Sequence, residues 1–158
     1  MSAGNVIPLL HLHAGADGNG SARADPATQM QVVAQALQYF SVHFNRPLVI
    51  GDVADAIGTS EGFLDLSFEC IRGITPALAL REHRLNRLFQ SLSDQPRQGL
   101  GGAIRACGLG QTRGVVQLFE QEFGIDMPLF LLTCRRADDD RRFRRLHPEV
   151  SALTLPSP

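Results

Sequence analysis

Three carboxylates spaced by four residues are the side chains in this sequence with the clearest capacity for binding. Glu61, Asp65 and Glu69 fall on one side of a predicted helix, because residues four apart lie one above another on a helix. Such an acidic stripe repels phosphates and attracts a basic surface, and Leu66 adds an apolar side chain beside it. The stripe has two interpretations. It is either a solvated helix face or a binding site for a protein partner that uses Glu61, Asp65, Leu66 and Glu69.

The other reactive side chains do not show a spacing typical of catalysis or of metal binding. Cys70, Cys107 and Cys134 are far apart and odd in number, so buried, reduced thiols are expected rather than a zinc or redox site. His11 and His13 lie in a segment rich in Gly, Ala, Asp and Ser, where a histidine pair rarely forms a metal site. The sequence has a single Tyr and lacks a glycine-rich phosphate loop after a strand. No enzymatic activity, cofactor or metal is expected.

Composition sets broad limits on size, charge and location. The 158 residues, 44% of them hydrophobic, are enough for one domain of up to two lobes with a real core. The net charge of −1 does not favour a nucleic acid or a membrane as the partner. No apolar run approaches the ~18 residues of a membrane span, so a cytoplasmic protein without a membrane partner is expected. The segment before the first predicted helix is too short to form a small-molecule domain.

The stretch from Thr75 to Leu92 predicts one long helix that organises the chain. Thr75 is a suitable N-cap, and Pro76 suits the first helical position, where its missing N–H costs nothing. Leu85, Leu88 and Leu92 recur at helical spacing. Arg81, Arg84 and Arg87 lie on the remaining surface, either as solvated side chains or as contacts for phosphates.

The residues on either side of this helix repeat. Phe68-Glu69 and Gly73-Ile74 recur as Phe119-Glu120 and Gly124-Ile125, each offset by 51 residues. Further upstream, Ala56-Ile57-Gly58 corresponds to Ala106-Cys107-Gly108, with an offset of 50 residues. Two copies are too few for a solenoid, so the repeat predicts a duplicated pair of helical units.

Apolar periodicity predicts helices at about residues 28–44, 50–57, 61–71, 75–92, 99–107, 111–122 and 127–136. Thr59-Ser60 is expected to cap the third of these helices. The residues expected to face the core include Phe40, Leu64, Phe68, Ile71, Val115 and Phe119, and the last helix is expected to pack Leu129, Phe130, Leu132 and Thr133 against the second half.

Two short helices separated by a glycine-containing turn form a helix-turn-helix, and this arrangement occurs twice. The expected fold class is all-α, with two helix-turn-helix subdomains joined by a long linker helix. The expected parts are a disordered segment (1–28), lobe one (29–74), the linker helix (75–92), lobe two (93–137) and a flexible tail (138–158). Asp138, Asp139 and Asp140 are expected to break the last helical pattern.

A series of landmarks extends through both halves of the chain. The first half contains Pro47-Leu48, Val53-Ala54, Gly58, Ser60, Leu64, Phe68, Gly73, Thr75-Pro76 and Arg84-Leu85. The second half contains Ala106-Cys107-Gly108, Phe119, Phe123-Gly124-Ile125 and Pro128. With these landmarks, residues 29–137 resemble the DNA-binding domain of AraC/XylS-type transcriptional regulators.

The resemblance implies double-stranded DNA as the partner. In such proteins the second helix of each helix-turn-helix, the recognition helix, enters the major groove, and the two grooves are one DNA turn apart, about 34 Å. The recognition helices implied here are residues 61–71 and 111–122. The resemblance places DNA contacts at Ser60, Glu61, Gly62, Asp65 and Leu66 in the first half, and at Gln111, Thr112, Arg113, Val116 and Gln117 in the second.

The chain departs from the family at these same positions. The family usually has Arg where this chain has Leu66 and Gln117, and basic or amide residues where it has Glu61, Asp65 and Glu69. Two functions follow. The first is a sequence-specific DNA-binding regulator that reads DNA mainly through its second helix-turn-helix. The second is a protein-interaction module that docks on a transcription factor or RNA polymerase through the acidic first recognition helix.

Overall fold

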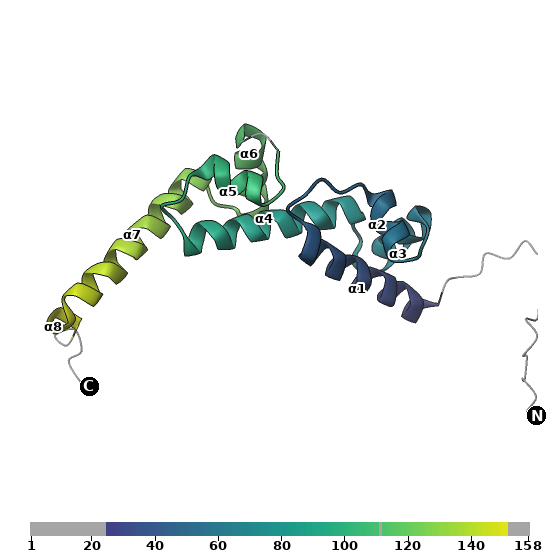
Figure 1. Ribbon diagram of the computed structural model, residues 1–158, viewed down its shortest axis with the longest axis horizontal. Coiled ribbons are helices and arrows are strands. Elements are labelled where there is room, and N and C mark those ends of the chain that lie inside the picture. Colours follow the sequence, from purple (N-terminus) through teal and green to yellow (C-terminus); the bar gives the residue numbers. More distant parts are fainter. Residues whose placement is uncertain (1–24, 111, 152–158) are drawn as a thin grey trace, which may run out of the picture.

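A computed structural model describes residues 25–110 and 112–151, and this part of the chain is built from helices without any strand (Figure 1). The helices are α1 (Pro26–His43), α2 (Ile50–Ala56), α3 (Glu61–Arg72), α4 (Pro76–Asp94), α5 (Leu100–Ala106), α6 (Thr112–Phe123), α7 (Met127–Leu146) and α8 (Pro148–Ser151). The all-α prediction is confirmed. Most of the segment expected to be disordered lies outside the described residues, but α1 begins at Pro26, inside that segment.

Three helices begin with a side chain that caps the backbone N–H three residues later. The hydroxyls of Ser60 and Thr75 cap α3 and α4, each accepting a hydrogen bond from the backbone N–H three residues later at 3.2 Å. Asp126 caps α7 in the same way at 3.0 Å. Each cap stabilises its helix by roughly 0.5–2 kcal/mol. The predicted caps of α3 and α4 are confirmed, and Asp126 explains why α7 begins at Met127.

Helix α4 is shared between two hydrophobic cores. Its 19 residues form a rod of roughly 28 Å, at about 1.5 Å per residue. Ala79 and Leu80, near its start, belong to the core of lobe one, where they pack with α1, α2 and α3. Phe40 and Phe68 are fully buried there, with their ring centroids 6.3 Å apart. Lobe one is therefore held on the first half of α4.

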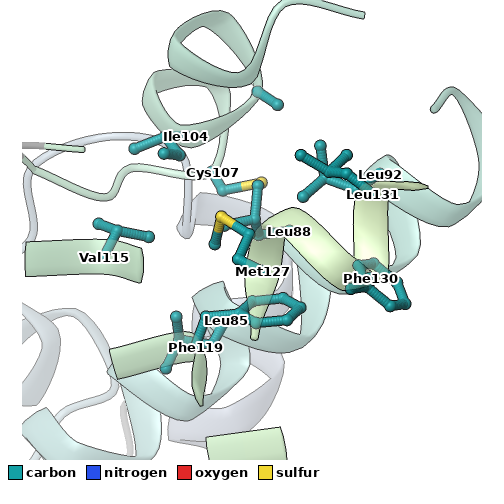
Figure 2. Packing of buried hydrophobic residues seen from close by; sticks show 11 residues of the cluster. Leu85, Leu88, Leu92, Ile104, Cys107, Val115, Phe119, Met127, Phe130 and Leu131 are labelled. Atoms are coloured by element: carbon teal, nitrogen blue, oxygen red, sulfur yellow. The ribbon is translucent and has the colours of Figure 1, made fainter. Parts of the chain in front are cut away.

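The second half of α4 carries lobe two (Figure 2). Leu85, Leu88 and Leu92 are buried against α5, α6 and α7. Aromatic rings fill this core: the Phe119 ring centroid lies 6.0 Å from that of Phe89 and 5.4 Å from that of Phe130. The residues labelled in Figure 2 are Leu85, Leu88, Leu92, Ile104, Cys107, Val115, Phe119, Met127, Phe130 and Leu131.

The two lobes meet at a junction formed by the end of α1, the middle of α4 and the turn after α5. Arg84 donates two hydrogen bonds of 2.8 Å, from Nε to the carbonyl of Phe44 and from Nη2 to the carbonyl of Arg46. Gly108 lies against this pair with a φ of +68°. A Cβ at Gly108 would be 2.3 Å from the Phe44 carbonyl oxygen and 3.1 Å from Arg84 Nε. Only glycine allows this approach, so the junction sets how lobe two sits against lobe one.

Helix α7 contradicts the prediction of a break at the three aspartates. It continues through Asp138, Asp139 and Asp140 to Leu146, and its second half extends away from lobe two (Figure 1). Ion pairs compensate the acidic run: Asp138 lies 3.3 Å from Arg97 Nε and 3.1 Å from Arg142 Nε. Because these cations neutralise neighbouring carboxylates on the helix, the predicted tail from 138 is wrong as far as Leu146.

The inward face of α7 also differs from the predicted one. Leu129 and Leu132 were expected to pack against lobe two, but they are 54% and 65% exposed. Phe130, predicted with them, is buried, and Met127 and Leu131 are buried beside it. The run of adjacent leucines in this segment makes helical periodicity ambiguous, so the sequence pattern selected the wrong side of the helix.

Candidate nucleic-acid interface

The first helix-turn-helix consists of α2 and α3, which lie over the first half of α4. Gly58 turns the chain after α2 with a φ of +75°, and Ser60 starts α3. Leu64, Ser67 and Phe68 face the core, which leaves the opposite side of α3 in solvent. Gly62 and Asp65, two of the predicted DNA contacts, lie on this exposed side. Ser60, another predicted contact, is an exposed residue whose hydroxyl caps α3.

The acidic stripe lies on the exposed side of α3, but the carboxylate of Glu61 is directed toward α2. A Cβ built on Gly51 would be 3.0 Å from Glu61 Oε2, so this carboxylate lies against the first turn of α2. Asp65 and Glu69 are exposed, and Leu66 beside them is 46% exposed. The outward-facing part of the stripe is therefore formed by Asp65, Leu66 and Glu69.

Ile71 and Cys70 extend the exposed surface at the end of α3. Ile71 was expected in the core, but it is 40% exposed, whereas Phe68, predicted on the same face, is fully buried. Cys70 is also exposed, contrary to the expectation of a buried thiol, whereas Cys107 is buried. Burial raises the pKa of the Cys107 thiol, and the positive charge of Arg87 opposes this only in part. Cys107 is thus an inert core residue.

The second helix-turn-helix consists of α5 and α6 on the second half of α4. Val115 and Phe119 anchor α6 in the core. Thr112, Arg113 and Gln117 are exposed, as expected for side chains that reach a ligand. Val116 is half-buried and packs against the core of lobe two, so it presents only part of its surface. Gln111, also predicted to contact DNA, lies outside the described residues.

The three arginines of α4 have different environments. Arg84 belongs to the junction, and its pKa is lowered by burial without loss of its charge. The Arg87 guanidinium lies 5.1 Å from the centroid of the Phe44 ring, a cation–π contact, and donates to Gln90. Arg81 is exposed and borders an open groove between α4 and α6. Of the three, Arg81 is therefore the side chain available to a phosphate.

Charge is distributed unevenly over the two recognition helices. Helix α3 carries Glu61, Asp65 and Glu69 against one arginine, Arg72. Helix α6 carries one arginine, Arg113, at its start and two glutamates near its end. The start of α6 is also the positive end of the helix dipole. Of the two recognition helices, α6 presents the surface more favourable to phosphates.

One histidine in the junction has a perturbed pKa. Burial lowers the pKa of His83, and the positive charge of Arg87 lowers it further. Its Nε2 is buried without a hydrogen-bond partner in the described part of the chain, and its ring meets Phe44 edge-on at 5.5 Å. His83 is therefore held neutral between the lobes.

The described residues hold no cluster of three or more His, Cys, Asp or Glu side chains that would bind a metal ion. Among these residues, no helix is both long and apolar enough to cross a bilayer.

Comparison with known proteins rests on structure, because neither protein-family models nor curated protein sequences give a significant match. A transcriptional regulator with an AraC-type DNA-binding domain from Chromobacterium violaceum superposes with a TM-score of 0.63 at 23% identity, over 68% of this chain and 96% of that one. A probable AraC family transcriptional regulator from Rhodopseudomonas palustris gives a TM-score of 0.61 at 22% identity, over 66% and 97%. The chain has the fold of an AraC-type DNA-binding domain.

A third structure extends this likeness. The C-terminal domain of AraT, a response regulator from Geobacillus stearothermophilus, matches with a TM-score of 0.59 at 19% identity, over 71% of this chain and 88% of that one. The AraC-type fold predicted from the landmarks is thereby confirmed.

Two features of this fold were missed in the sequence. The contact of Gly108 with Phe44 joins residues far apart in the chain, so it has no local pattern. The length of α7 did have a sequence pattern: the N-caps Thr75 and Asp126 are 51 residues apart, the offset of the repeat. Helix α7 is thus the counterpart of the long α4.

Proposed function

We propose that this chain is a sequence-specific DNA-binding transcriptional regulator of the AraC type, reading DNA mainly through α6. The observation that carries the proposal is the mounting of two helix-turn-helix units on one α4 rod. Its length of roughly 28 Å approaches the ~34 Å of one DNA turn. A rod of this length supports two recognition helices in successive major-groove segments.

Within this proposal, the exposed side of α6 reads base edges. Arg113 suits the two acceptors of guanine, and Gln117 suits adenine, since both pairings are bidentate. Thr112 precedes them at the start of the helix, and Val116 offers a small apolar contact. Gln111, which lies outside the described residues, is included in this proposal as a DNA contact.

Other groups contribute less to base reading in this proposal. Arg81 binds a phosphate between the lobes, which fixes the register without reading sequence. In the first unit, Ser60, Gly62 and Asp65 contact DNA more weakly, because the neighbouring carboxylates oppose the release of counterions.

Binding to duplex DNA at two salt concentrations tests this proposal. The full chain should bind a random duplex with an affinity that falls steeply as salt rises, since each phosphate contact contributes about 0.9 to the slope of log K against log salt. It should bind a selected duplex more tightly than the random one. A chain that binds neither duplex at low salt contradicts the proposal.

A second function is supported by the outward-facing part of the acidic stripe. Asp65, Leu66 and Glu69 combine two carboxylates with an exposed apolar side chain on one helix face. This combination suits a protein partner with a basic surface, such as a transcription factor or RNA polymerase. In this alternative α3 docks on the partner and stays away from DNA.

Neutralising the stripe separates the two functions. If α3 approaches DNA, changing Glu61, Asp65 and Glu69 to Gln should raise affinity for any duplex and steepen its salt dependence. A control with Asp94→Gln, Asp140→Gln and Glu149→Gln removes the same charge far from α3. An equal effect of both triple variants means that α3 does not face DNA. The docking alternative then additionally requires that the stripe variant, and not the control, lose binding to a basic protein partner.

A further inference from the structure

The exposed face of α7 carries most of the large apolar side chains that lobe two leaves in solvent. Leu129, Leu132, Phe143 and Leu146 are 54%, 65%, 51% and 76% exposed. They lie opposite the face that Met127, Phe130 and Leu131 bury in lobe two, so lobe two does not cover them. A row of this kind on one helix is unusual for a surface that stays in water.

These four residues follow a heptad pattern interrupted by two charges. Counting Leu129 as position a, Leu132 is d, Arg136 is a, Asp139 is d, Phe143 is a and Leu146 is d. The pattern is apolar at both ends and charged in the middle. Arg136 and Asp139 are both solvent-exposed, at 82% and 56%.

We propose that α7 forms an antiparallel pair with α7 of a second copy of this chain. In an antiparallel coiled coil, a positions face d positions. Placing Leu129 against Leu146 of the second copy also places Leu132 against Phe143, and Arg136 against Asp139. Each of these three residue pairs forms one layer of the interface, and the two-fold axis between the copies generates a second, identical layer. The six a and d positions form the seam of this pair. In one register, every apolar seam residue faces an apolar residue and every cation faces an anion. Because one register satisfies all six positions, a second copy of this chain is the partner that fits this face.

Charges beside the seam are compatible with this pairing. Arg135 and Arg142 of opposite copies come near each other, but Arg135 Nε donates to the Pro96 carbonyl at 3.0 Å and Arg142 Nε pairs with Asp138 at 3.1 Å. Both cations are thereby held by their own chain. Asp139 also contacts Arg97, and its exposure leaves room for Arg136 of the second copy.

The internal repeat points to the same face. With the N-caps Thr75 and Asp126 aligned, Arg136, Asp139 and Phe143 correspond to Leu85, Leu88 and Leu92 of α4. In α4 the side chains at these positions pack in the core of the neighbouring unit, lobe two. Among the described residues, no neighbouring unit covers the equivalent face of α7, and a second copy supplies one.

The paired helices form an isologous interface, in which the same patch serves both copies. It holds two double helix-turn-helix domains in a two-fold arrangement. This inference does not depend on DNA binding, although such a dimer would suit a palindromic site.

Charge variants test the register with the full chain in the absence of nucleic acid. Sedimentation equilibrium over a range of concentrations should show the 17.2 kDa chain associating to a dimer. Arg136→Asp makes both central seam positions acidic, and Asp139→Arg makes both basic. Each variant alone should remain monomeric at concentrations where the parent dimerises. A mixture of the two should recover the dimer, because every central layer again pairs opposite charges.

A matched control changes charge on the other side of the helix. Arg145→Asp makes the same change away from the seam and should dimerise like the parent, while circular dichroism confirms that every variant is folded. A parent that stays monomeric at the highest soluble concentration overturns the proposal. So does a parent dimer that both single variants preserve, or a mixture of the variants that stays monomeric.

Discussion

Replacing Gly108 by alanine tests the junction between the lobes. Two costs are expected. The first is conformational, because a residue with a Cβ at a φ of +68° pays about 1–2 kcal/mol. The second is steric, because the new Cβ would be 2.3 Å from the backbone carbonyl oxygen of Phe44, which cannot rotate away as a side chain can. Such overpacking typically costs about 1–3 kcal/mol.

Gly58 provides a matched control in the other half of the repeat. It ends α2 as Gly108 follows α5, with a φ of +75°, but a Cβ there would have no atom within 4 Å. Gly58→Ala should therefore cost only the conformational ~1–2 kcal/mol. The reduced entropy of the unfolded chain is common to both variants and cancels in the comparison. Gly108→Ala should be the more destabilising by about 1–3 kcal/mol.

Urea unfolding followed by circular dichroism measures both costs, since all the described elements are helical. The difference in stability follows from the urea concentrations at the unfolding midpoints, provided that the variants have the same m-value. If Gly108→Ala and Gly58→Ala lose the same stability, the close contact with Phe44 is not a constraint and the lobes are not fixed by this junction. If they differ as expected, Gly108→Ala should also weaken DNA binding more than Gly58→Ala.

Three further predictions concern single side chains. Arg113→Ala should lose ~1–3 kcal/mol of DNA-binding free energy at one preferred base. Arg105→Ala, also on lobe two, should leave the base preference unchanged. If both variants keep the same base preference, Arg113 does not read a base. The pKa of His83 is lowered in the folded state, so the unfolded chain binds a proton first and stability should fall as pH drops below about 6.5. In His83→Leu this part of the pH dependence should disappear in urea titrations, and an unchanged slope would contradict the buried neutral imidazole. Burial raises the pKa of Asp138, but the hydrogen bond from Arg97 and nearby arginine charges lower it overall. Its contribution is therefore present above about pH 3.9 and is lost as pH falls through the lower folded value. Asp138→Asn should lose helicity at neutral pH, and Asp140→Asn should lose less; the reverse order would contradict the role of Asp138 in extending α7.

Local patterns were sufficient to predict most of the fold. Ser60 and Thr75 were recognised as caps because capping depends on residues only three positions apart. The buried positions Phe40, Phe68, Leu88 and Phe119 were predicted from helical spacing and are fully buried. The duplicated unit was visible as a constant offset, and the AraC-type fold is confirmed by structural comparison.

Features that depend on distant contacts were not predicted. Helix α7 was ended too early because a run of three aspartates disfavours a helix unless cations surround it, and Arg97 comes from another part of the chain. Glu61 was taken to point outward with the rest of the acidic stripe, but its carboxylate lies against Gly51 of α2. Thr112, Arg113 and Gln117 of α6 are exposed, and their contact with DNA stays a prediction.

Selection of binding sites from a pool of random duplexes, followed by hydroxyl-radical footprinting of the full chain, tests the central claim most directly. An enriched sequence is expected, with strong protection over one major-groove segment that α6 binds. A second segment about 10–10.5 base pairs away, bound by the first helix-turn-helix, should be protected more weakly. A pool that shows no enrichment after selection would contradict the claim that this chain reads DNA sequence.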